Sequence, residues 1–474
     1  MSRLDLIIRG GTVITHDGGR VADIGVADGK IVALASNLSG GAREQIDAAG
    51  LHIFPGLIDS HVHFNEPGRA EWEGIETGSR ALAAGGGTMF FDMPLNAHPP
   101  TLDGESFDLK MVAAKKKSLV DFAFWGGLVP QNLDKLEELA ERGVIGFKAF
   151  MADSGIEDFS RADDKTLREG MKRAAKLGKL VAVHAESESL TRQLAQEHIA
   201  KGQTSIRDYL NSRPVEAELD AIRRAIDMAG ETGCALHVVH VSSGEGVALI
   251  SAARKLGADV TCETCPHYLV LTEADMEKLG AVAKCAPPLR SKSEQEKLWQ
   301  RLLAGEVTTV GSDHSPSPPE MKRDANFFKV WGGISGGQYT LPLLLSRSRR
   351  GNEAHSEIRN SQSLLTPAAT KIEKDGLALS LIAKLTSFNV AGRFKLPATK
   401  GRIEIGADAD FALAGLRQSF SVRAADLFYR HKHSPYVGRV LTGKVVQTIL
   451  RGQTVFKDGK IVSSPLGRLV KPQR

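Results

Sequence analysis

Eight short apolar segments, separated by stretches of helical periodicity, constrain the fold of this chain more than any other feature. Stretches such as 166–177 and 217–229 have the helical period. The apolar segments lie at 53–64, 88–93, 121–127, 144–150, 180–186, 235–242, 259–265 and 307–313. Alternating strands and helices are typical of a parallel sheet covered by helices, and about eight such units make a closed barrel. We therefore expect the α/β class and a TIM-like (β/α)8 barrel over residues 53–399.

The two ends of the chain have a different pattern, which indicates a second, smaller domain. Residues 1–52 alternate apolar and polar side chains between glycine-containing turns, and the same alternation returns at 445–452 and 455–462. Short alternating runs between such turns predict antiparallel strands. We expect a small β-sandwich built from both termini, residues 1–52 and 400–474, with the barrel inserted between them.

Composition and charge exclude several classes of protein. The 474 residues carry a net charge of +5, and the lysine run 115–117 lies in a helical pattern, so we expect no nucleic-acid partner. No apolar run has the length of a transmembrane helix and no signal peptide is evident, so we expect a cytoplasmic protein without membrane contact. Four cysteines are too few for a disulfide framework. Cys262 and Cys265 have CxxC spacing, but packed thiols explain them better than a redox or zinc site.

Ionisable residues at the ends of the apolar segments form the candidate active site. His61 and His63 are one residue apart, so on a strand both side chains point to the same face. Later segments contain or end at Lys148, His184, His240 and Asp313. Burying any of these groups alone would cost several kcal/mol. Since the carboxyl ends of barrel strands meet at one rim, six such groups are better explained as metal ligands than as unrelated buried side chains.

Lys148 needs a separate explanation, because a protonated amine would repel a nearby divalent cation. A neutral lysine amine can take up CO2 to form a carbamate, whose two oxygens can bridge two metal ions. His61 and His63 would hold one ion, and His184 and His240 the other. The alternative, a lysine that extends to solvent, is weaker beside five other candidate ligands. We expect two divalent ions, zinc first, with cobalt, manganese or iron as alternatives.

Two other histidines are assigned no ligand role. His237 lies three residues before His240, so on a strand it faces the opposite way and is expected to pack against helices. His314 follows Asp313 and is expected to support the ligands rather than to bind metal.

Five motifs surround the candidate ligands: His61-Val62-His63, Gly146-Phe147-Lys148, Val183-His184, Val239-His240 and Gly311-Ser312-Asp313. Together they resemble the motifs of the cyclic amidohydrolases, which include dihydroorotases, dihydropyrimidinases (hydantoinases) and allantoinases. The resemblance covers nearly the whole chain. It implies a barrel whose binuclear metal centre is bridged by a hydroxide and by a carboxylated lysine, here N6-carboxylysine at Lys148. It also implies a homo-oligomer, either a tetramer or a dimer.

Within this family, residues 63–74, 92–96 and 331–336 are most similar to the allantoinases. Dihydroorotases have an arginine two residues after the second histidine, which holds the substrate carboxylate. Here that residue is Asn65, whose uncharged amide suits a neutral cyclic ureide such as allantoin. The tyrosine that hydantoinases use five residues after the bridging lysine is replaced by Asp153.

The expected reaction is hydrolysis of the cyclic amide bond of allantoin to give allantoate, with a metal-activated hydroxide as the nucleophile. Asp313 is the expected acid–base, which passes the proton to the departing ring nitrogen. The residues expected to orient the substrate ring are Asn65, Asn96, Ser154 and Ala286.

Two alternatives stay open. One is a hydantoinase or dihydropyrimidinase acting on another neutral cyclic ureide. The other is a non-catalytic, metal-free scaffold, which should have lost metal ligands, whereas all six positions are filled here. The polar segment 351–376 matches no motif of the family, and its length favours a surface role as a lid, an oligomer contact or a loop.

Overall fold

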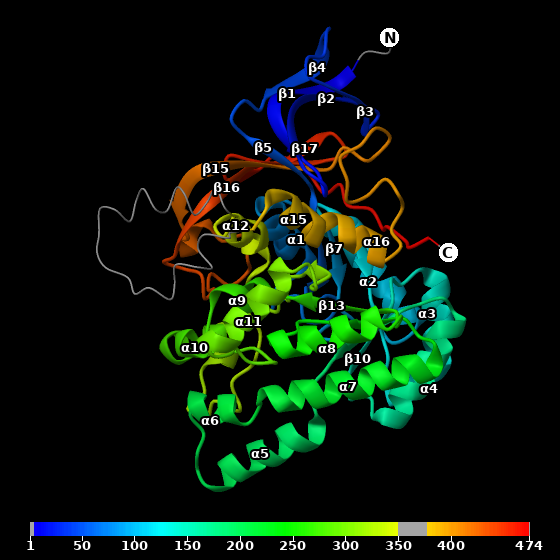
Figure 1. Ribbon diagram of the computed structural model, residues 1–474, viewed down its shortest axis with the longest axis vertical. Helices are drawn as coiled ribbons and strands as arrows, with labels where there is room; N and C mark the ends of the chain where they lie inside the picture. The colour runs from blue at the N-terminus through cyan, green and yellow to red at the C-terminus, as the bar shows by residue number, and fades with distance from the viewer. Residues whose placement is uncertain (1–3, 349–376, 474) are drawn as a thin grey trace.

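The computed structural model describes residues 4–348 and 377–473. The segment 351–376, for which a surface role is predicted, falls outside the described residues. The described chain has two regions: a β-sheet formed by both ends of the chain, at the top of Figure 1, and a larger α/β region below it. The α/β class is therefore confirmed.

Both ends of the chain contribute strands to one nine-stranded sheet, in the order β18-β17-β16-β15-β5-β1-β2-β3 with β4 beside β1. Its strands are β1 (Leu4–Ile14), β2 (Gly19–Ala27), β3 (Lys30–Ala35), β4 (Ala42–Asp47), β5 (His52–Pro55), β15 (Phe411–Ser421), β16 (Val440–Leu450), β17 (Gln453–Lys457) and β18 (Lys460–Ile461). Strand β5 pairs with β15 and so joins the two ends. The apolar side chains of the sheet, such as Ile24 and Phe411, form a core of their own.

The predicted antiparallel pairing is confirmed for most of this sheet, including β1 with β2, but is wrong for the pairs of β1 with β4 and β5, which are parallel. The hairpin between β2 and β3 follows the turn chemistry of the sequence. Ala27 pairs with Lys30 across Asp28-Gly29, and both turn residues have positive φ angles, 49° and 73°. Such a two-residue turn requires this conformation, which Asp and Gly adopt more readily than other residues.

Every predicted strand segment of the α/β region contains a strand. The strands are β6 (Leu57–Val62), β7 (Gly87–Asp92), β8 (Asp121–Phe124), β9 (Gly126–Gly127), β10 (Phe147–Phe150), β11 (Val181–His184), β12 (Leu236–Val238), β13 (Val260–Thr264) and β14 (Thr309–Val310). Their pairings give two parallel sheets, β6-β7-β8 and β9 to β14. Trp125 alone separates β8 from β9, and a parallel bridge joins Val62 to His314 beyond β14.

The first predicted segment, 53–64, is wrong as a single strand. Its first part belongs to β5 in the terminal sheet, and its second part is β6. Gly56 separates the two: its N–H donates to the carbonyl of Asp410 at 2.9 Å. A Cβ atom at Gly56 would lie 2.2 Å from Oγ1 of Thr88, so only glycine fits at this position without a clash. Both parts are apolar, which is why the sequence pattern does not reveal the change of partner.

The helices between the strands include α4 and α7, which confirm the helices predicted at 166–177 and 217–229. The described helices are α1 (Ile75–Ala84), α2 (Gly104–Lys117), α3 (Leu136–Arg142), α4 (Asp164–Lys176), α5 (Glu188–Ala200), α6 (Ile206–Asn211), α7 (Val215–Thr232), α8 (Gly244–Lys255), α9 (Pro266–Val270), α10 (Glu273–Leu279), α11 (Lys292–Leu303), α12 (Thr340–Leu345), α15 (Leu379–Ala383) and α16 (Asn389–Arg393). The Asp163 side chain caps α4 by accepting from the Thr166 N–H at 2.8 Å. None of the described helices combines the length and hydropathy that a bilayer-spanning helix requires.

Two smaller predictions concern the thiols and the lysine run. Cys262 and Cys265 are buried and free, which confirms packed thiols. In the lysine run, Lys115 and Lys116 are exposed as predicted, and Lys117 pairs with Glu66.

Candidate active site

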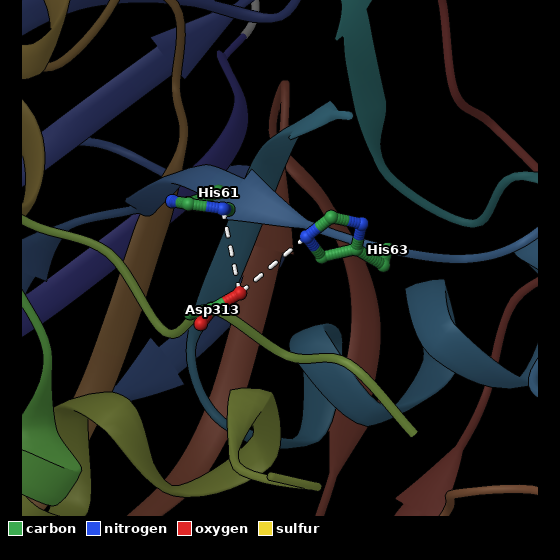
Figure 2. A group of neighbouring side chains, drawn as sticks. All are labelled: His61, His63 and Asp313. Carbon is green, nitrogen blue, oxygen red and sulfur yellow. Dashed lines mark ion pairs between the residues drawn. The ribbon is translucent and has the colours of Figure 1, made fainter. Parts of the chain in front are cut away.

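Three of the predicted ligands meet at the carboxyl end of β6. This strand is buried along its whole length, and its alternation directs His61 and His63 to one face. Asp313 follows β14, and its Oδ1 lies 3.3 Å from Nε2 of His61 and 3.4 Å from Nε2 of His63. Figure 2 shows both imidazoles turned toward this carboxylate. One ligand atom from each residue lies within 4.8 Å of the others, so the three could hold one metal ion.

A second pair of imidazoles lies beside the first. His184 ends β11, and His240 follows β12. Nδ1 of His184 is 3.1 Å from Nε2 of His240. The ring of His240 is also 5.4 Å from the ring of His61, centroid to centroid, and the rings of His61 and His63 are separated by the same distance. The four predicted histidines therefore form one continuous group.

Lys148 lies on β10 and is fully buried. Its Nζ is 4.7 Å from the centre of the Phe150 ring and has no hydrogen-bond partner among the described residues. Burial lowers the pKa of Lys148 to about 8, although the carboxylates of Asp313 and Glu263 oppose this shift. A buried amine without a partner is costly. A carbamate on this nitrogen that binds metal would remove that cost, so Lys148 fits the predicted modification.

Four predicted site residues have an unusual backbone conformation. The φ angle is 61° at Asn65, 69° at Asn96, 41° at His240 and 45° at Asp313. Positive φ is tolerated by Asn and is uncommon for other residues with a side chain. Strain of this kind is found mostly where function demands a particular side-chain direction. The side chains of His240 and Asp313 lie close to those of other predicted ligands, His184 and His61.

Two buried carboxylates orient the imidazoles, and the sequence analysis assigned a role to neither. On β13, Oε1 of Glu263 lies 2.8 Å from Nδ1 of His61. Oε2 of Glu186 lies 2.8 Å from Nε2 of His184, and Arg213 pairs with the same carboxylate. Burial alone would raise the pKa of Glu186, but Arg213 and His184 lower it to about 2. Each carboxylate fixes which imidazole nitrogen stays free for a metal: Nε2 of His61 and Nδ1 of His184.

The sequence held a signal for both carboxylates. Glu263 interrupts an apolar segment, as the predicted ligands do, and Glu186 follows His184 by two residues. The Cys262–Cys265 spacing is a motif of thiol chemistry and indicates no role for Glu263, which lies between the two cysteines.

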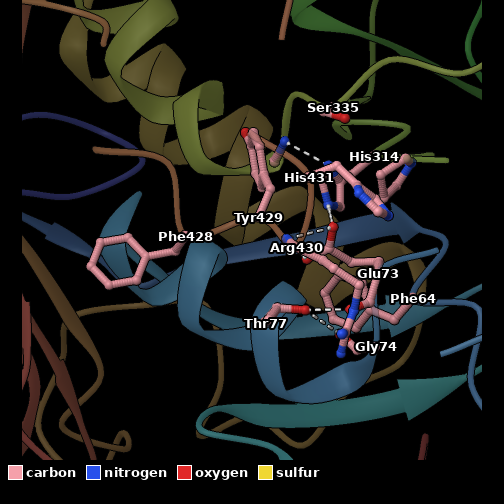
Figure 3. Close-up of polar contacts among 12 residues, drawn as sticks. Phe64, Glu73, Gly74, Thr77, His314, Ser335, Phe428, Tyr429, Arg430 and His431 are labelled. Carbon is pink, nitrogen blue, oxygen red and sulfur yellow. Dashed lines mark hydrogen bonds and ion pairs between the residues drawn. The ribbon is translucent and has the colours of Figure 1, made fainter. Parts of the chain in front are cut away.

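His314 contacts the segment that carries His63 and the backbone at Gly336. Its carbonyl accepts from the N–H of His63 at 2.8 Å, and its Nδ1 accepts from the N–H of Gly336 at 3.1 Å. Its ring packs 4.7 Å from that of Tyr429. Figure 3 shows the segment that carries Tyr429 lying against the loop that follows His63, where Arg430 Nε donates to the carbonyl of Glu73 at 2.7 Å.

His237 faces away from the site, which confirms the prediction. Its Nδ1 is 2.8 Å from Oγ1 of Thr261, and its ring lies 5.3 Å from that of Phe394, next to α16.

The ligand group opens into a cavity of about 380 Å³. Five of the six predicted ligands line it: His61, His63, His184, His240 and Asp313. Three predicted substrate contacts also line it: Asn96, Ser154 and Ala286. Residues 328–333 line it as well. The cavity therefore places the predicted ring contacts beside the predicted ligands.

The predicted substrate contacts differ in what their side chains can offer. The Asn96 amide lies 3.4 Å from Nδ1 of His63, so it also orients that ring. The Ser154 hydroxyl already donates to the carbonyl of Phe159 at 2.6 Å. Asn65 is 1% exposed and is not among the residues that line the cavity. Its Nδ2 donates to the carbonyl of Pro316 at 3.4 Å, while its Oδ1 has no partner among the described residues.

With this geometry established, the chain can be compared with known proteins. The model of the amidohydrolase family matches residues 52–455. The chain belongs to the amidohydrolase family. This is a metal-dependent family, and the cluster of His61, His63 and Asp313 provides donors suited to a divalent ion.

Curated relatives match this amidohydrolase over its whole length. A protein named allantoinase from Rubrobacter xylanophilus is 56% identical over 474 residues, which are 100% of this chain and 99% of the relative. Another allantoinase, from Deinococcus radiodurans, is 49% identical over 470 residues, 99% of each chain.

Among solved structures, the amidohydrolase is similar to an L-hydantoinase (dihydropyrimidinase) from Arthrobacter aurescens. The TM-score is 0.91 at 33% identity, with 99% of this chain and 100% of the other covered. The dihydropyrimidinase from Brevibacillus agri has a TM-score of 0.86 at 31% identity, with 98% of each chain covered.

Proposed function

We propose that this protein is a hydrolase of the cyclic amide bond of allantoin, which it opens to allantoate. The observation that carries the proposal is full-length identity to relatives named allantoinase, from 44% to 56% over at least 95% of the chain. The uncharged amide at Asn65, where dihydroorotases have an arginine, also favours a neutral substrate.

The proposed fold is a TIM-like (β/α)8 barrel over residues 53–399 with a β-sandwich from residues 1–52 and 400–474. The bridge between Val62 and His314 supports closure of the ring, because it joins the two parallel sheets at their outer strands. The continuity of β8 and β9 through Trp125 supports the other junction. Strand β5 moves the first boundary to about Gly56.

The proposed metal site holds two divalent ions, with zinc as the first choice and cobalt, manganese or iron as alternatives. The proposed ligands are His61, His63, His184, His240, Asp313 and the CO2-derived carbamate of Lys148. The unpartnered amine of Lys148 and the fixed tautomers of His61 and His184 support this assignment. When bound, the ions would supply an activated water and polarise the carbonyl of the substrate.

Asp313 is proposed as the acid–base. Burial would favour its protonated form, but the imidazoles around it, His61 and His63 among them, hold the pKa of Asp313 well below its usual range. The carboxylate is thus ready to accept the proton of the attacking water and to pass it to the departing ring nitrogen. Asn96, Ser154 and the backbone at Ala286 are proposed to orient the ring. Asn65 is buried and does not line the cavity, so it would influence the ring without direct contact.

Replacing Asp313 by Asn tests this assignment. The variant should keep at least part of its bound metal and lose about 10²- to 10⁴-fold in turnover, the usual contribution of a general acid–base. Metal content by elemental analysis and ring opening of allantoin should be measured on the same preparation. Near-normal turnover would reject the role.

The second candidate function is hydrolysis of another neutral cyclic ureide, which the hydantoinase names of the structural neighbours favour. Rates of the metal-loaded protein on allantoin, hydantoin, dihydrouracil and dihydroorotate decide between the two. We expect the highest kcat/KM on allantoin. A higher value on hydantoin or dihydrouracil would replace allantoin as the proposed substrate. Elemental analysis showing no metal would instead favour the metal-free scaffold.

We also propose a homo-oligomer, a tetramer or a dimer, located in the cytoplasm, as the family resemblance implies. The four free, buried cysteines are consistent with a reducing compartment. Light scattering on the purified protein gives the subunit number directly.

A further inference from the structure

One irregular segment, residues 327–333, forms part of the cavity wall. Residues 328–333 all line the cavity. The segment contains neither helix nor strand, so its carbonyl groups have no regular backbone partners. Carbonyl groups in such a place need donors from elsewhere in the molecule. The donors found here are two lysine side chains.

Lys284 holds the first half of this segment. Its Nζ donates to the carbonyls of Phe327 at 2.6 Å and Val330 at 2.5 Å, and more weakly to that of Phe328 at 3.4 Å. Nζ also lies 4.4 Å from the centre of the Tyr209 ring. Lys284 is 4% exposed, so a polar amine has been taken out of water to make these contacts. Its own carbonyl accepts from the N–H of Gly333 at 2.8 Å, which ties the same residue to the far end of the segment.

Lys322 holds the second half. Its Nζ donates to the carbonyls of Trp331 at 2.9 Å and Gly333 at 2.8 Å. The N–H of Trp331 donates to the carbonyl of Met321 at 2.9 Å, so the neighbouring backbone is fixed as well. Together the two lysines engage five of the seven carbonyls in residues 327–333.

We propose that Lys284 and Lys322 are positioning residues that fix segment 327–333 as the substrate-facing wall of the cavity. They act through backbone carbonyls and do not touch the reacting atoms. Lys284 also directly precedes Cys285 and Ala286, which line the cavity, so it connects two stretches of backbone that face the substrate. The identity of the substrate rests on the proposed function. The role of the two lysines in fixing residues 327–333 does not depend on it.

The first test measures the segment itself, by hydrogen–deuterium exchange of peptides that cover 318–336. Lys284→Met keeps the length and apolar stem of the side chain and removes the donor. It should increase exchange in 327–333 about tenfold or more and leave the strands unchanged. Lys322→Met should act mainly on 331–333. Lys278→Met is the matched control, because Lys278 is exposed on α10 nearby.

The second test separates positioning from catalysis. Lys284→Met should raise KM for allantoin about tenfold, with kcat within about threefold and metal content unchanged. Lys284→Gln, which keeps two N–H donors, should fall between this variant and the native protein. Propylammonium replaces the atoms that Lys284→Ala removes, so it should restore both KM and slow exchange in that variant.

The outcomes distinguish this inference from the proposed function. Unchanged exchange in 327–333 in both Met variants, or a loss of kcat with unaltered KM, overturns the positioning role. If Lys284→Met does not fold, Lys322→Met and Lys284→Gln decide by the same measurements. If the native protein does not open allantoin, the proposed function fails, and the exchange experiment still decides the role of the lysines.

Discussion

Replacing Glu263 by Gln should weaken the binding of one metal ion and leave the fold unchanged. Glu263 is fully buried on β13, where Oε1 faces Nδ1 of His61 at 2.8 Å and Oε2 accepts from the Ser60 hydroxyl at 2.5 Å. Gln has nearly the same shape and keeps one acceptor oxygen. It loses the negative charge that makes His61 a better donor to a cation through Nε2.

The size of the effect follows from these two contacts. A hydrogen bond to a charged group contributes about 1.5–3 kcal/mol, against about 1 kcal/mol for a neutral one. The change from carboxylate to amide at His61 therefore removes about 0.5–2 kcal/mol, which corresponds to about 2- to 30-fold in affinity. Loss of a carboxylate behind a metal-binding imidazole commonly weakens metal binding about 10- to 100-fold. We expect about 10- to 30-fold weaker binding of the ion held by His61 and His63.

In the assay, a chelator of known affinity competes with the metal-loaded protein for its metal ions. The titration gives separate affinities for the weaker-bound and the tighter-bound ion. Glu216→Gln, an exposed change on α7, is the control and should leave both affinities unaltered. Circular dichroism should show the same secondary structure in all three proteins. Affinities of Glu263→Gln within twofold of the native values would show that this carboxylate does not tune His61, and the reasoning would be refuted.

Three further predictions concern other parts of the molecule. Lys148→Met should reduce bound metal from two ions to one or none and abolish any response to added bicarbonate, because the proposed carbamate cannot form; elemental analysis with two ions retained would contradict it. Gly56→Ala should lower the free energy of unfolding by about 1–3 kcal/mol, because the new Cβ would lie 2.2 Å from Oγ1 of Thr88. Gly41→Ala, where a Cβ meets nothing within 4 Å, is its control in denaturant titrations, and equal midpoints for the two variants would refute the clash. Burial raises the pKa of Glu73 to about 8, so the native state binds a proton that the unfolded chain releases above about pH 4.5, and the stability from this group is lost as pH rises toward 8. Glu73→Gln should therefore gain about 1–3 kcal/mol relative to the native protein between pH 5 and pH 8, and parallel stability curves for the two proteins would count against a protonated Glu73.

Much of the fold was predictable because it depends on local patterns. Apolar segments of strand length remain strands wherever they pair, and the Asp28-Gly29 turn follows from the conformations that these two residues allow. The change of partner at Gly56 was not predictable, since the residues on both sides of it are equally apolar and only the approach of Thr88 separates them. The parallel pairing of β1 with β4 depends in the same way on a long-range choice of partner.

The candidate site was predictable to a similar degree. Strand alternation places His61 and His63 together, and the parallel order of the strands brings the later residues to the same region. What the sequence could not give is which groups lie behind them. Glu263 is 202 residues from His61 along the chain, and Arg213, in the connection between α6 and α7, is 27 residues from Glu186. Asn65 is buried, does not line the cavity and has a positive φ, and no periodicity encodes that backbone conformation.

The contact of residues 429–431 with the loop behind His63 has a consequence for biosynthesis. Strand β15 closes the terminal sheet onto β5, and Arg430 holds the carbonyl of Glu73 from a position 357 residues later in the sequence. A growing chain that has emerged from the ribosome as far as Asp313, and so holds every proposed metal ligand, still lacks these contacts. They form only after the segment that carries Arg430 has emerged as well.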